Sequence, residues 1–402
     1  MIAYISPLIP KKTGIAQYSH HLIMALQTEL AINHETIDIF DDQVAKTNSC
    51  QQNYQAKELL PLLFEPSSRV QYRQFIYHFG NNPEFHLSAL KLLQQQKGIV
   101  VLHDTVLFFL LAGLGTGGLW QILAKQSATT GYTRLQHILA DCPQQDILRY
   151  PFPEKQPFLQ SVLSQATAVV VHSLLAEQLV REANYQKAIF RVPLIDYQQP
   201  TSIDITKIQG HATQSLFDSK TSKDLFYIGL FGFSGNTKRS EVLFKVLSAL
   251  PADIKSRIKL IIVGAAFYQD QVTAMGLSKQ VHFIGYISDD DYDQCLAMCD
   301  LIVNLRYPSM GETSAVQIQA MSAEKPTLVS NHGWFSELPD QAVYKIPVDQ
   351  QEAECLTQGI IKMFDDNAFR LTMAKHAKQY VKHYHNPAKV ATQWVDILST
   401  PY

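Results

Sequence analysis

The segment RYPSMGETSAVQIQAMSAEKP, residues 306–326, places an acidic turn at the start of a predicted helix. Ser314 is a favourable N-cap, and Gln317 three residues later completes a Ser-x-x-Gln capping box. The backbone N–H groups in the first turn of such a helix attract anions, above all phosphate. Glu312 precedes the cap and can accept hydrogen bonds from hydroxyl groups. The spacing therefore predicts a ligand that carries both a phosphate and a polyol.

Two loops in the first half of the chain have polar residues at the end of a predicted strand. In SPLIPKKTGIAQYS, Gly14 allows backbone amides to approach a bound group, although an ordinary strand-to-helix turn explains the same residues. In GIVVLHDTVLFFL, His103 and Asp104 follow an apolar run. The alternatives to a binding role are that Asp104 caps the next helix and that His103 is a satisfied structural histidine.

A third loop, in GLFGFSGNTKRSEVLFKVL, combines glycines with two cations. Gly232 and Gly235 make the loop flexible, and Lys238 and Arg239 enter a predicted helix whose backbone amides already favour an anion. The spacing is not that of a P-loop. A solvated basic start of a helix is the alternative interpretation.

Short apolar runs that alternate with helical patterns place these loops in an α/β fold. Buried parallel strands are predicted at MIAYIS, FIYHFG, GIVVLHD and AVVVHS, and later at LFYIGLFGF, IKLIIVGA, VHFIGYI, DLIVNLR and PTLVSN. Ligands of such sheets bind beyond the carboxyl ends of the strands, where the four loops lie. We predict a domain over 1–195, a polar linker over 196–222 and a second domain over 223–380. The C-terminal helix over 381–402, broken at Asn386-Pro387, either ends the second domain or reaches back to the first.

Composition restricts the class of protein. The 402 residues are 46% hydrophobic and 17% charged, which is typical of a globular chain, and a net charge of -2 gives no overall attraction to nucleic acid. Five cysteines favour a reducing compartment, and Cys295 with Cys299 is better explained as helix core than as a metal site. No apolar stretch reaches the roughly 20 residues of a membrane span. The expected location is the cytoplasm, with peripheral contact between Lys11-Lys12 and the membrane as a further hypothesis.

These motifs resemble those of bacterial glycosyltransferase family 4. The likeness rests on YHFGNNPEFH, VVLHDTVLFFLL, VVVHS, GLFGFSGNTKRSEVLF, DLIVNLRYPSMGETS and PTLVSNHGWFSELPD, in the family's order over most of residues 1–350. It implies the GT-B fold, in which two Rossmann-like α/β domains with parallel sheets face a central cleft. The resemblance fades over residues 112–165, so details of the acceptor side do not carry over.

The same resemblance implies a reaction and its substrates. A hexose-type sugar is expected to move from a UDP-sugar or GDP-sugar, with retention at the anomeric carbon and without a required metal or cofactor. The expected acceptor is a glycan or a lipid-linked or protein-linked group, as in bacterial surface polysaccharide or glycoconjugate biosynthesis. The nucleobase is expected to lie against the backbone at Gly285 and Tyr286.

The resemblance also assigns roles to residues. Glu312 is expected to hold sugar hydroxyls, His103 to contact the transferred sugar and Lys238 to neutralise the diphosphate; these three are the predicted catalytic residues, and no metal ligand is expected. The predicted donor-binding residues are Gly14, Gly232, Arg239, Gly285, Tyr286, Arg306, Thr313, Ser314, Ala315 and Gln319.

Several positions depart from the family's pattern. Members commonly have two glutamates eight positions apart, whereas here Gln319 stands in the place of the second and Glu312 is displaced by one. Phe233 stands where an arginine often follows the loop glycine. A catalytically weak partner subunit or sugar-nucleotide binding module is therefore the alternative function. A dinucleotide-dependent oxidoreductase is disfavoured, because no Gly-x-Gly-x-x-Gly follows the first strand.

Two other signals have competing explanations. The acidic run SDDDYD, residues 288–293, is predicted to open a helix rather than to bind a metal, because carboxylates favour the positive end of a helix dipole. Trp334 and Phe335 in NHGWFSELPD either stack on a sugar or pack in the protein interior.

Overall fold

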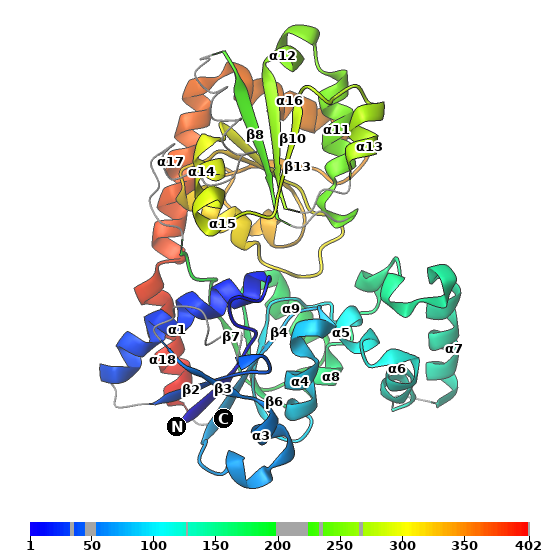
Figure 1. Cartoon of the computed structure of the whole chain (residues 1–402), viewed down its shortest axis with the longest axis vertical. Coiled ribbons are helices and arrows are strands. Elements are labelled where there is room, and N and C mark those ends of the chain that lie inside the picture. Colours follow the sequence, from blue (N-terminus) through cyan, green and yellow to red (C-terminus); the bar gives the residue numbers. More distant parts are fainter. Residues whose placement is uncertain are drawn as a thin grey trace. The chain divides into compact units, whose positions relative to one another are not determined.

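The structure is a computed structural model that describes residues 1–32, 36–44, 54–125, 128–197, 224–232, 236–264 and 268–400. The chain divides into two compact units (Figure 1). Unit 1 consists of Met1–Ile195, Met310–Thr313 and Pro387–Tyr402, and unit 2 of Asp196–Ser309 and Ser314–Asn386. Apart from Asp196 and Tyr197, the predicted linker over 196–222 lies outside the described residues.

A sheet of seven parallel strands forms the centre of unit 1, in the order β3-β2-β1-β4-β5-β6-β7. The central strands are mostly apolar and buried along almost their whole length, as expected of a parallel sheet that is covered by helices on both faces. The strands are β1 Ile2–Ile5, β2 Ile37–Asp41, β3 Ala56–Glu58, β4 Gln74–Phe79, β5 Gly98–Leu102, β6 Ala166–Val171 and β7 Ile189–Arg191.

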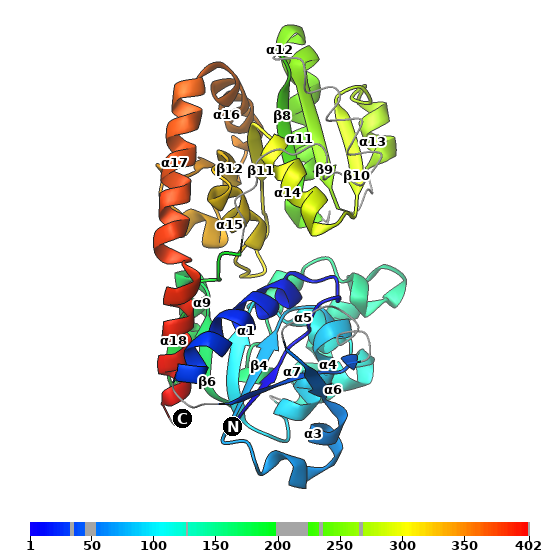
Figure 2. The same ribbon diagram turned by 60° about the vertical axis from the view of Figure 1, so that its left-hand side comes forward.

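The helices of unit 1 include one contributed by the end of the described chain. Helix α18, Pro387–Ser399, packs beside α1, Gly14–Ile32 (Figure 2), with Trp394 fully buried and the Leu398 carbonyl accepting from Arg73 at 3.0 Å. The others are α3 Leu60–Phe64, α4 Pro83–Leu93, α5 Phe108–Ala112, α6 Gly115–Ala124, α7 Ala128–Ala140, α8 Gln160–Leu163 and α9 Leu174–Glu182.

Unit 2 repeats this plan with a sheet of six parallel strands in the order β10-β9-β8-β11-β12-β13. The strands are β8 Phe226–Phe231, β9 Ile258–Val263, β10 Val281–Gly285, β11 Leu301–Asn304, β12 Thr327–Ser330 and β13 Tyr344–Ile346. The helices are α11 Ser240–Ala249, α12 Ala252–Arg257, α13 Gln269–Ala274, α14 Asp289–Met298, α15 Ala315–Ser322, α16 Glu352–Asp365 and α17 Asn367–Tyr384. The break expected at Asn386-Pro387 is confirmed, since it separates α17 from α18.

The structure confirms the predicted α/β class, with a Rossmann-like parallel sheet in each unit. The helix-core interpretation of Cys295 and Cys299 is also confirmed, because both thiols are buried on and just after α14 and burial raises the pKa of Cys295 to about 12. Trp334 and Phe335 are buried, so the packing interpretation holds for both. Within the described ranges, no helix combines the length and the apolar character needed to cross a bilayer.

Candidate active site

Lys238 in unit 2 is buried against the carboxyl end of β8. Its ammonium donates to the Phe231 carbonyl, and only 5% of the residue is exposed. A Cβ built on Gly232, where φ is +90°, would lie 2.7 Å from Lys238 Nζ and 3.7 Å from Val316 Cγ2. A glycine is therefore needed at position 232, both for its backbone conformation and because the ammonium occupies the space beside it. These distances also place the ammonium close to the first turn of α15.

The first turn of α15 has the predicted N-cap but not the complete capping box. Ser314 Oγ accepts from the Gln317 N–H at 3.2 Å, which confirms the cap. The prediction of a second capping-box bond, between the Gln317 side chain and the Ser314 N–H, is wrong. Gln317 Nε2 instead donates to Thr327 Oγ1 at 2.8 Å, and its Oε1 accepts from Asn304 Nδ2 at 3.2 Å. Gln317 is fully buried, so its amide satisfies other buried polar groups.

The beginning of α15 thus combines a buried cation with helix amides. The N–H groups of Ala315 and Val316, in the first turn, have no partner within the helix. They carry the positive end of the helix dipole, and the Lys238 ammonium lies near the Val316 side chain of the same turn. A bound diphosphate would meet positive charge from both.

The two predicted arginines have different surroundings. Arg306 donates from Nη1 to Thr237 Oγ1 at 3.4 Å, which ties it to the turn that carries Lys238. Arg239 forms an ion pair with buried Glu352, with Nε 3.1 Å from Oε1. Because Glu352 compensates its charge, Arg239 adds little net charge to this region. The sequence alone gives no sign of Glu352, which lies more than a hundred residues away.

Other predicted donor residues lie at neighbouring strand ends. Gly285 ends β10 with φ +75°, and its carbonyl accepts from the Gly264 N–H at 2.8 Å. Tyr286 next to it is 62% exposed. Gln319 Oε1 accepts from the hydroxyl of partly buried Tyr292 at 3.1 Å, which holds the side chain in place. Phe233 lies outside the described residues.

His103 in unit 1 belongs to a cluster of buried imidazoles at the carboxyl ends of β4, β5 and β6. Its Nε2 lies 3.0 Å from His78 Nδ1, and its ring centroid lies 4.8 Å from that of His172. Burial lowers the pKa of both His78 and His103, so both rings are neutral at pH 7. Within the described residues, His78 Nε2 is buried without a hydrogen-bond partner.

The surroundings of His78 decide which nitrogens carry protons. A buried N–H without an acceptor is rarer than a buried acceptor without a donor, so the proton of His78 belongs on Nδ1. His78 then donates to His103 Nε2, and the His103 proton is on Nδ1. His103 is therefore both a satisfied structural histidine and a ring with a defined N–H donor.

Glu312 lies in a segment of unit 1, residues 310–313, that is bonded to the β5–α5 loop. The Met310 carbonyl accepts from the N–H groups of Thr105 at 2.8 Å and Val106 at 3.0 Å. Glu312 Oε2 accepts from the Met310 N–H at 2.6 Å, across Gly311 at φ +78°. The carboxylate therefore stabilises the turn in which it lies, and the glycine gives the turn its left-handed backbone.

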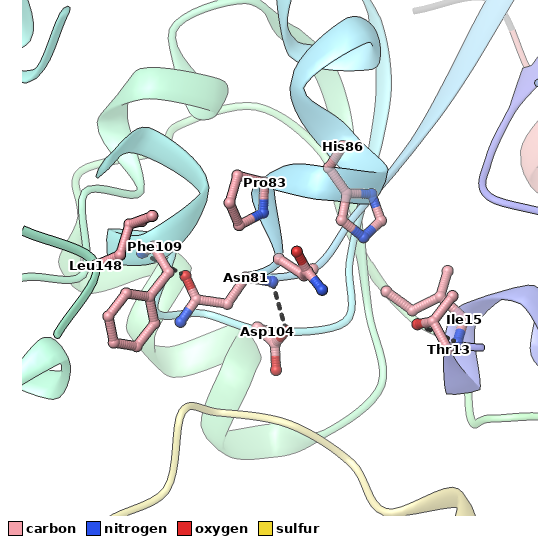
Figure 3. A pocket seen from close by; sticks show the side chains of 10 residues that line it. Thr13, Ile15, Asn81, Pro83, His86, Asp104, Phe109 and Leu148 are labelled. Atoms are coloured by element: carbon pink, nitrogen blue, oxygen red, sulfur yellow. Dashed lines mark hydrogen bonds between the residues drawn. The ribbon is translucent and has the colours of Figure 1, made fainter. Parts of the chain in front are cut away.

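Gly14 is the first residue of α1, and a Cβ built on Gly14 would meet nothing within 4 Å. Its neighbours Thr13 and Ile15 line a pocket of about 500 Å³ in unit 1 (Figure 3). Asp104 also lines this pocket. The helix-cap interpretation of Asp104 is wrong, because its Oδ2 accepts from the Asn81 N–H at 2.7 Å and the next helix begins only at Phe108. A long loop after β5 thus turns Asp104 towards the loop after β4.

Two other sequence interpretations have clear outcomes. Ser288 Oγ accepts from the Asp291 N–H at 3.2 Å at the start of α14, so the acidic run opens a helix as predicted. Lys11 forms ion pairs with Asp41 and Asp42, and only 5% of its side chain is exposed. Lys11 therefore does not present its charge to a lipid surface, and its place in the membrane hypothesis is wrong.

The buried histidines predict a pH-dependent stability. Burial lowers the pKa of His86, on α4, to about 3, whereas a histidine in the unfolded chain titrates near about 6.5. Between these values the unfolded state binds one more proton at this site, so stability falls as the pH falls, by up to about 1.4 kcal/mol per pH unit. In urea unfolding between pH 7.5 and 5.5, the free energy of unfolding should fall less steeply with falling pH for His86→Gln than for wild type. His376→Gln, on the exposed side of α17, is the matched control, and equal slopes for all three proteins would contradict the expectation.

Comparisons with known proteins bear on this arrangement. Residues 213–380 match the family of group 1 glycosyl transferases. The uncharacterized glycosyltransferase MJ1069 of Methanocaldococcus jannaschii is 25% identical over 166 residues, which are 40% of this chain and 41% of that protein. The matched region thus spans less than half of the relative. The predicted class of enzyme, a glycosyltransferase, is confirmed for the domain that these residues form.

Solved structures extend the likeness to almost the whole chain. Alr3699/HepE of Anabaena, in complex with UDP and glucose, has 16% identity, a TM-score of 0.64 and 99% coverage of each chain. Sucrose-phosphate synthase from Thermosynechococcus elongatus has 18% identity, a TM-score of 0.63 and coverage of 99% and 98%. WaaG, a glycosyltransferase involved in lipopolysaccharide biosynthesis, has 13% identity, a TM-score of 0.62 and coverage of 99% and 100%. These similarities confirm the predicted GT-B fold of two Rossmann-like domains.

Proposed function

We propose that this chain is a retaining glycosyltransferase of family 4 that transfers a hexose from a nucleoside diphosphate sugar, with UDP as the favoured nucleotide. The observation that carries the proposal is the buried Lys238 ammonium beside Gly232 and the first turn of α15. The choice of UDP draws support from HepE, whose structures contain UDP and UDP-glucose.

The proposed chemistry needs positive charge at the leaving group. The bond between the anomeric carbon and the diphosphate oxygen breaks, and its electron pair stays on the diphosphate. Lys238 and the α15 amides stabilise that charge, and preorganised donors of this kind contribute most where water is excluded. The acceptor hydroxyl forms the new bond on the same face of the sugar, and its proton passes to the departing phosphate oxygen. No step in this scheme calls for a metal or a second carboxylate, in contrast to glycoside hydrolases.

Unit 1 supplies the groups that meet sugar hydroxyls in this proposal. The His103 Nδ1–H is a donor of fixed tautomer, and Glu312 is an acceptor. The acceptor substrate is proposed to be a glycan or a lipid-linked or protein-linked glycoconjugate of the cell surface, modified in the cytoplasm. The involvement of WaaG in lipopolysaccharide biosynthesis supports this class of product.

Thermal unfolding with nucleotides tests the donor site. At about 100 times its dissociation constant, a bound nucleotide should stabilise the folded protein by about 2.7 kcal/mol. We expect UDP to raise Tm more than GDP, ADP or NAD does, and the shift to be lost in Lys238→Ala. Lys245→Ala, on the exposed face of α11, should keep the shift. Equal shifts in wild type and Lys238→Ala would refute the role of Lys238.

A partner subunit or sugar-nucleotide binding module is the alternative function. It rests on Gln319, whose amide already bonds to Tyr292 and offers no second carboxylate to a nucleotide. This alternative predicts that UDP raises Tm, but that the protein neither transfers the sugar of a UDP-sugar nor slowly hydrolyses the UDP-sugar. A single-turnover assay with UDP-glucose therefore separates the two functions.

A further inference from the structure

The pocket of unit 1 has a chemical character that specifies its ligand (Figure 3). We propose that it binds an uncharged sugar ring of the acceptor, through hydroxyl groups, and that it does not bind a phosphate. Only the identification of this sugar as part of the acceptor rests on the proposed function. The pocket's own donors and acceptors favour a neutral polyol.

His86 presents a hydrogen-bond acceptor to the pocket. Its Nδ1 lies 3.0 Å from the His78 carbonyl, which can only accept, so Nδ1 carries the proton. The ring is 1% exposed and neutral, and its Nε2 therefore carries a lone pair. A Cβ built on Gly80 would lie 3.1 Å from this nitrogen, which shows that Nε2 faces the space above Gly80. A hydroxyl group of a ligand is the natural donor to it.

Asn81 and Asp104 complete a set of fixed polar groups. Asn81 Oδ1 accepts from the N–H groups of Phe109 at 2.8 Å and Leu110 at 3.3 Å. This orients the amide and leaves its NH₂ group as a donor at the pocket. Asp104, held by its bond to the Asn81 N–H, adds a carboxylate. These three groups offer two acceptors and one donor, and Thr13 and Asn82, which also line the pocket, add a hydroxyl and a second amide. Sugar hydroxyls can satisfy such a mixed set because each hydroxyl both donates and accepts.

The same groups disfavour a phosphate. None of the described residues that line the pocket is a lysine or an arginine. A phosphate has only acceptor oxygens at neutral pH, so it would face the His86 lone pair and the Asp104 carboxylate, and no lysine or arginine of the described lining would attract it. Ile15, Pro83, Phe109 and Leu148 supply the apolar wall against which the C–H face of a sugar can pack. A volume of about 500 Å³ lies within the usual range of small-molecule sites.

Gly80 gives a direct way to fill the pocket. A Cβ at this position would meet Ile15 Cδ1 at 2.6 Å, Asp104 Oδ2 at 3.1 Å and His86 Nε2 at 3.1 Å. Gly80→Ala therefore places a methyl group between the acceptors. Gly117→Ala in α6 is the matched control, because a Cβ there meets nothing within 4 Å. Asp104→Asn is a second variant that keeps the shape and removes the charge.

The experiment measures binding to the full chain by ligand-observed NMR. The probes are methyl glycosides of glucose, galactose, mannose and N-acetylglucosamine, with glucose 6-phosphate as the charged probe. We expect at least one methyl glycoside to bind wild type and Gly117→Ala equally, and to bind Gly80→Ala and Asp104→Asn about tenfold or more weakly, since each variant breaks buried hydrogen bonds. Glucose 6-phosphate should bind the wild-type protein more weakly than the methyl glycosides do. Asp104→Asn should reduce this difference in affinity.

The outcomes separate this proposal from the proposed function. UDP binding is measured on the same samples and should be unchanged in Gly80→Ala, because the donor nucleotide is assigned to unit 2. If UDP binds but no glycoside does, or if glucose 6-phosphate binds best, the pocket assignment is overturned and the donor site stands. If a glycoside binds and is lost in Gly80→Ala while UDP does not bind, the pocket stands and the proposed transfer fails. Loss of UDP binding in Gly80→Ala would show a general disturbance and overturn the local assignment.

Discussion

Lys238→Ala is expected to lower the turnover number for sugar transfer by about 10² to 10³, the usual cost of removing one preorganised donor from a developing anion. The ammonium is buried, bonded to the Phe231 carbonyl and adjacent to the first turn of α15. The loss should appear in the turnover number, because charge on the diphosphate grows as the bond to the sugar breaks.

Two variants test whether the position of the Lys238 charge matters. Gly232→Ala should produce a similar loss although it removes no charge, because its Cβ would lie 2.7 Å from Lys238 Nζ in a backbone conformation that already disfavours a side chain. Lys245→Ala removes one lysine from the exposed face of α11 and should leave turnover unchanged. The measurement is release of UDP from UDP-glucose with and without acceptor. A Lys238→Ala enzyme within threefold of wild type would show that the α15 amides alone stabilise the leaving group.

Most of the strands could be predicted because they are largely apolar, which leaves few alternatives. Four strands were not predicted. The edge strands β3, β7 and β13 have only three residues each and mixed polarity, and β2 mixes apolar with acidic residues. Such strands depend on a neighbour in the sheet rather than on a sequence pattern. The capping box failed for a related reason. Gln317 has the right spacing, but tertiary contacts with Thr327 and Asn304 determine where its amide bonds.

Residues of the candidate site were predictable only where a residue of suitable chemistry lies in a loop that follows a predicted strand. Lys238, Gly232 and Ser314 are of this kind, and the structure places Lys238 beside Gly232 and the start of α15. The pairing of Arg239 with Glu352 and the bond between His78 and His103 join residues 113 and 25 positions apart. His86 and Asn81 lie in the motif YHFGNNPEFH, but only the fold turns them towards one pocket. Their signal in the sequence is that several polar residues directly follow a buried strand.

Gly311→Ala is expected to disturb unit 1 and, through Glu312, the transfer reaction. A Cβ at this position would overlap Thr105 Oγ1 and lie 2.7 Å from Thr105 Cβ, and Thr105 is almost fully buried. The left-handed backbone at φ +78° adds further strain. Together these effects should lower the free energy of unfolding by about 2 to 5 kcal/mol. The 310–313 segment can relieve the overlap only by moving, and a displacement of about 1 Å at Glu312 would cost about 10² in rate.

Two comparisons separate the overlap from the backbone strain. Gly115→Ala has almost the same positive φ, +75°, but its Cβ would meet nothing within 4 Å, so it should lose only about 1 kcal/mol and keep its activity. The double variant Thr105→Gly with Gly311→Ala removes the clashing side chain. Its loss of stability should be smaller than the sum of the two single losses by about 1 to 3 kcal/mol, the range seen for residues in contact. Additive losses, or a fully active Gly311→Ala protein, would mean that the 310–313 segment moves freely on unit 1 and that the turn does not position Glu312.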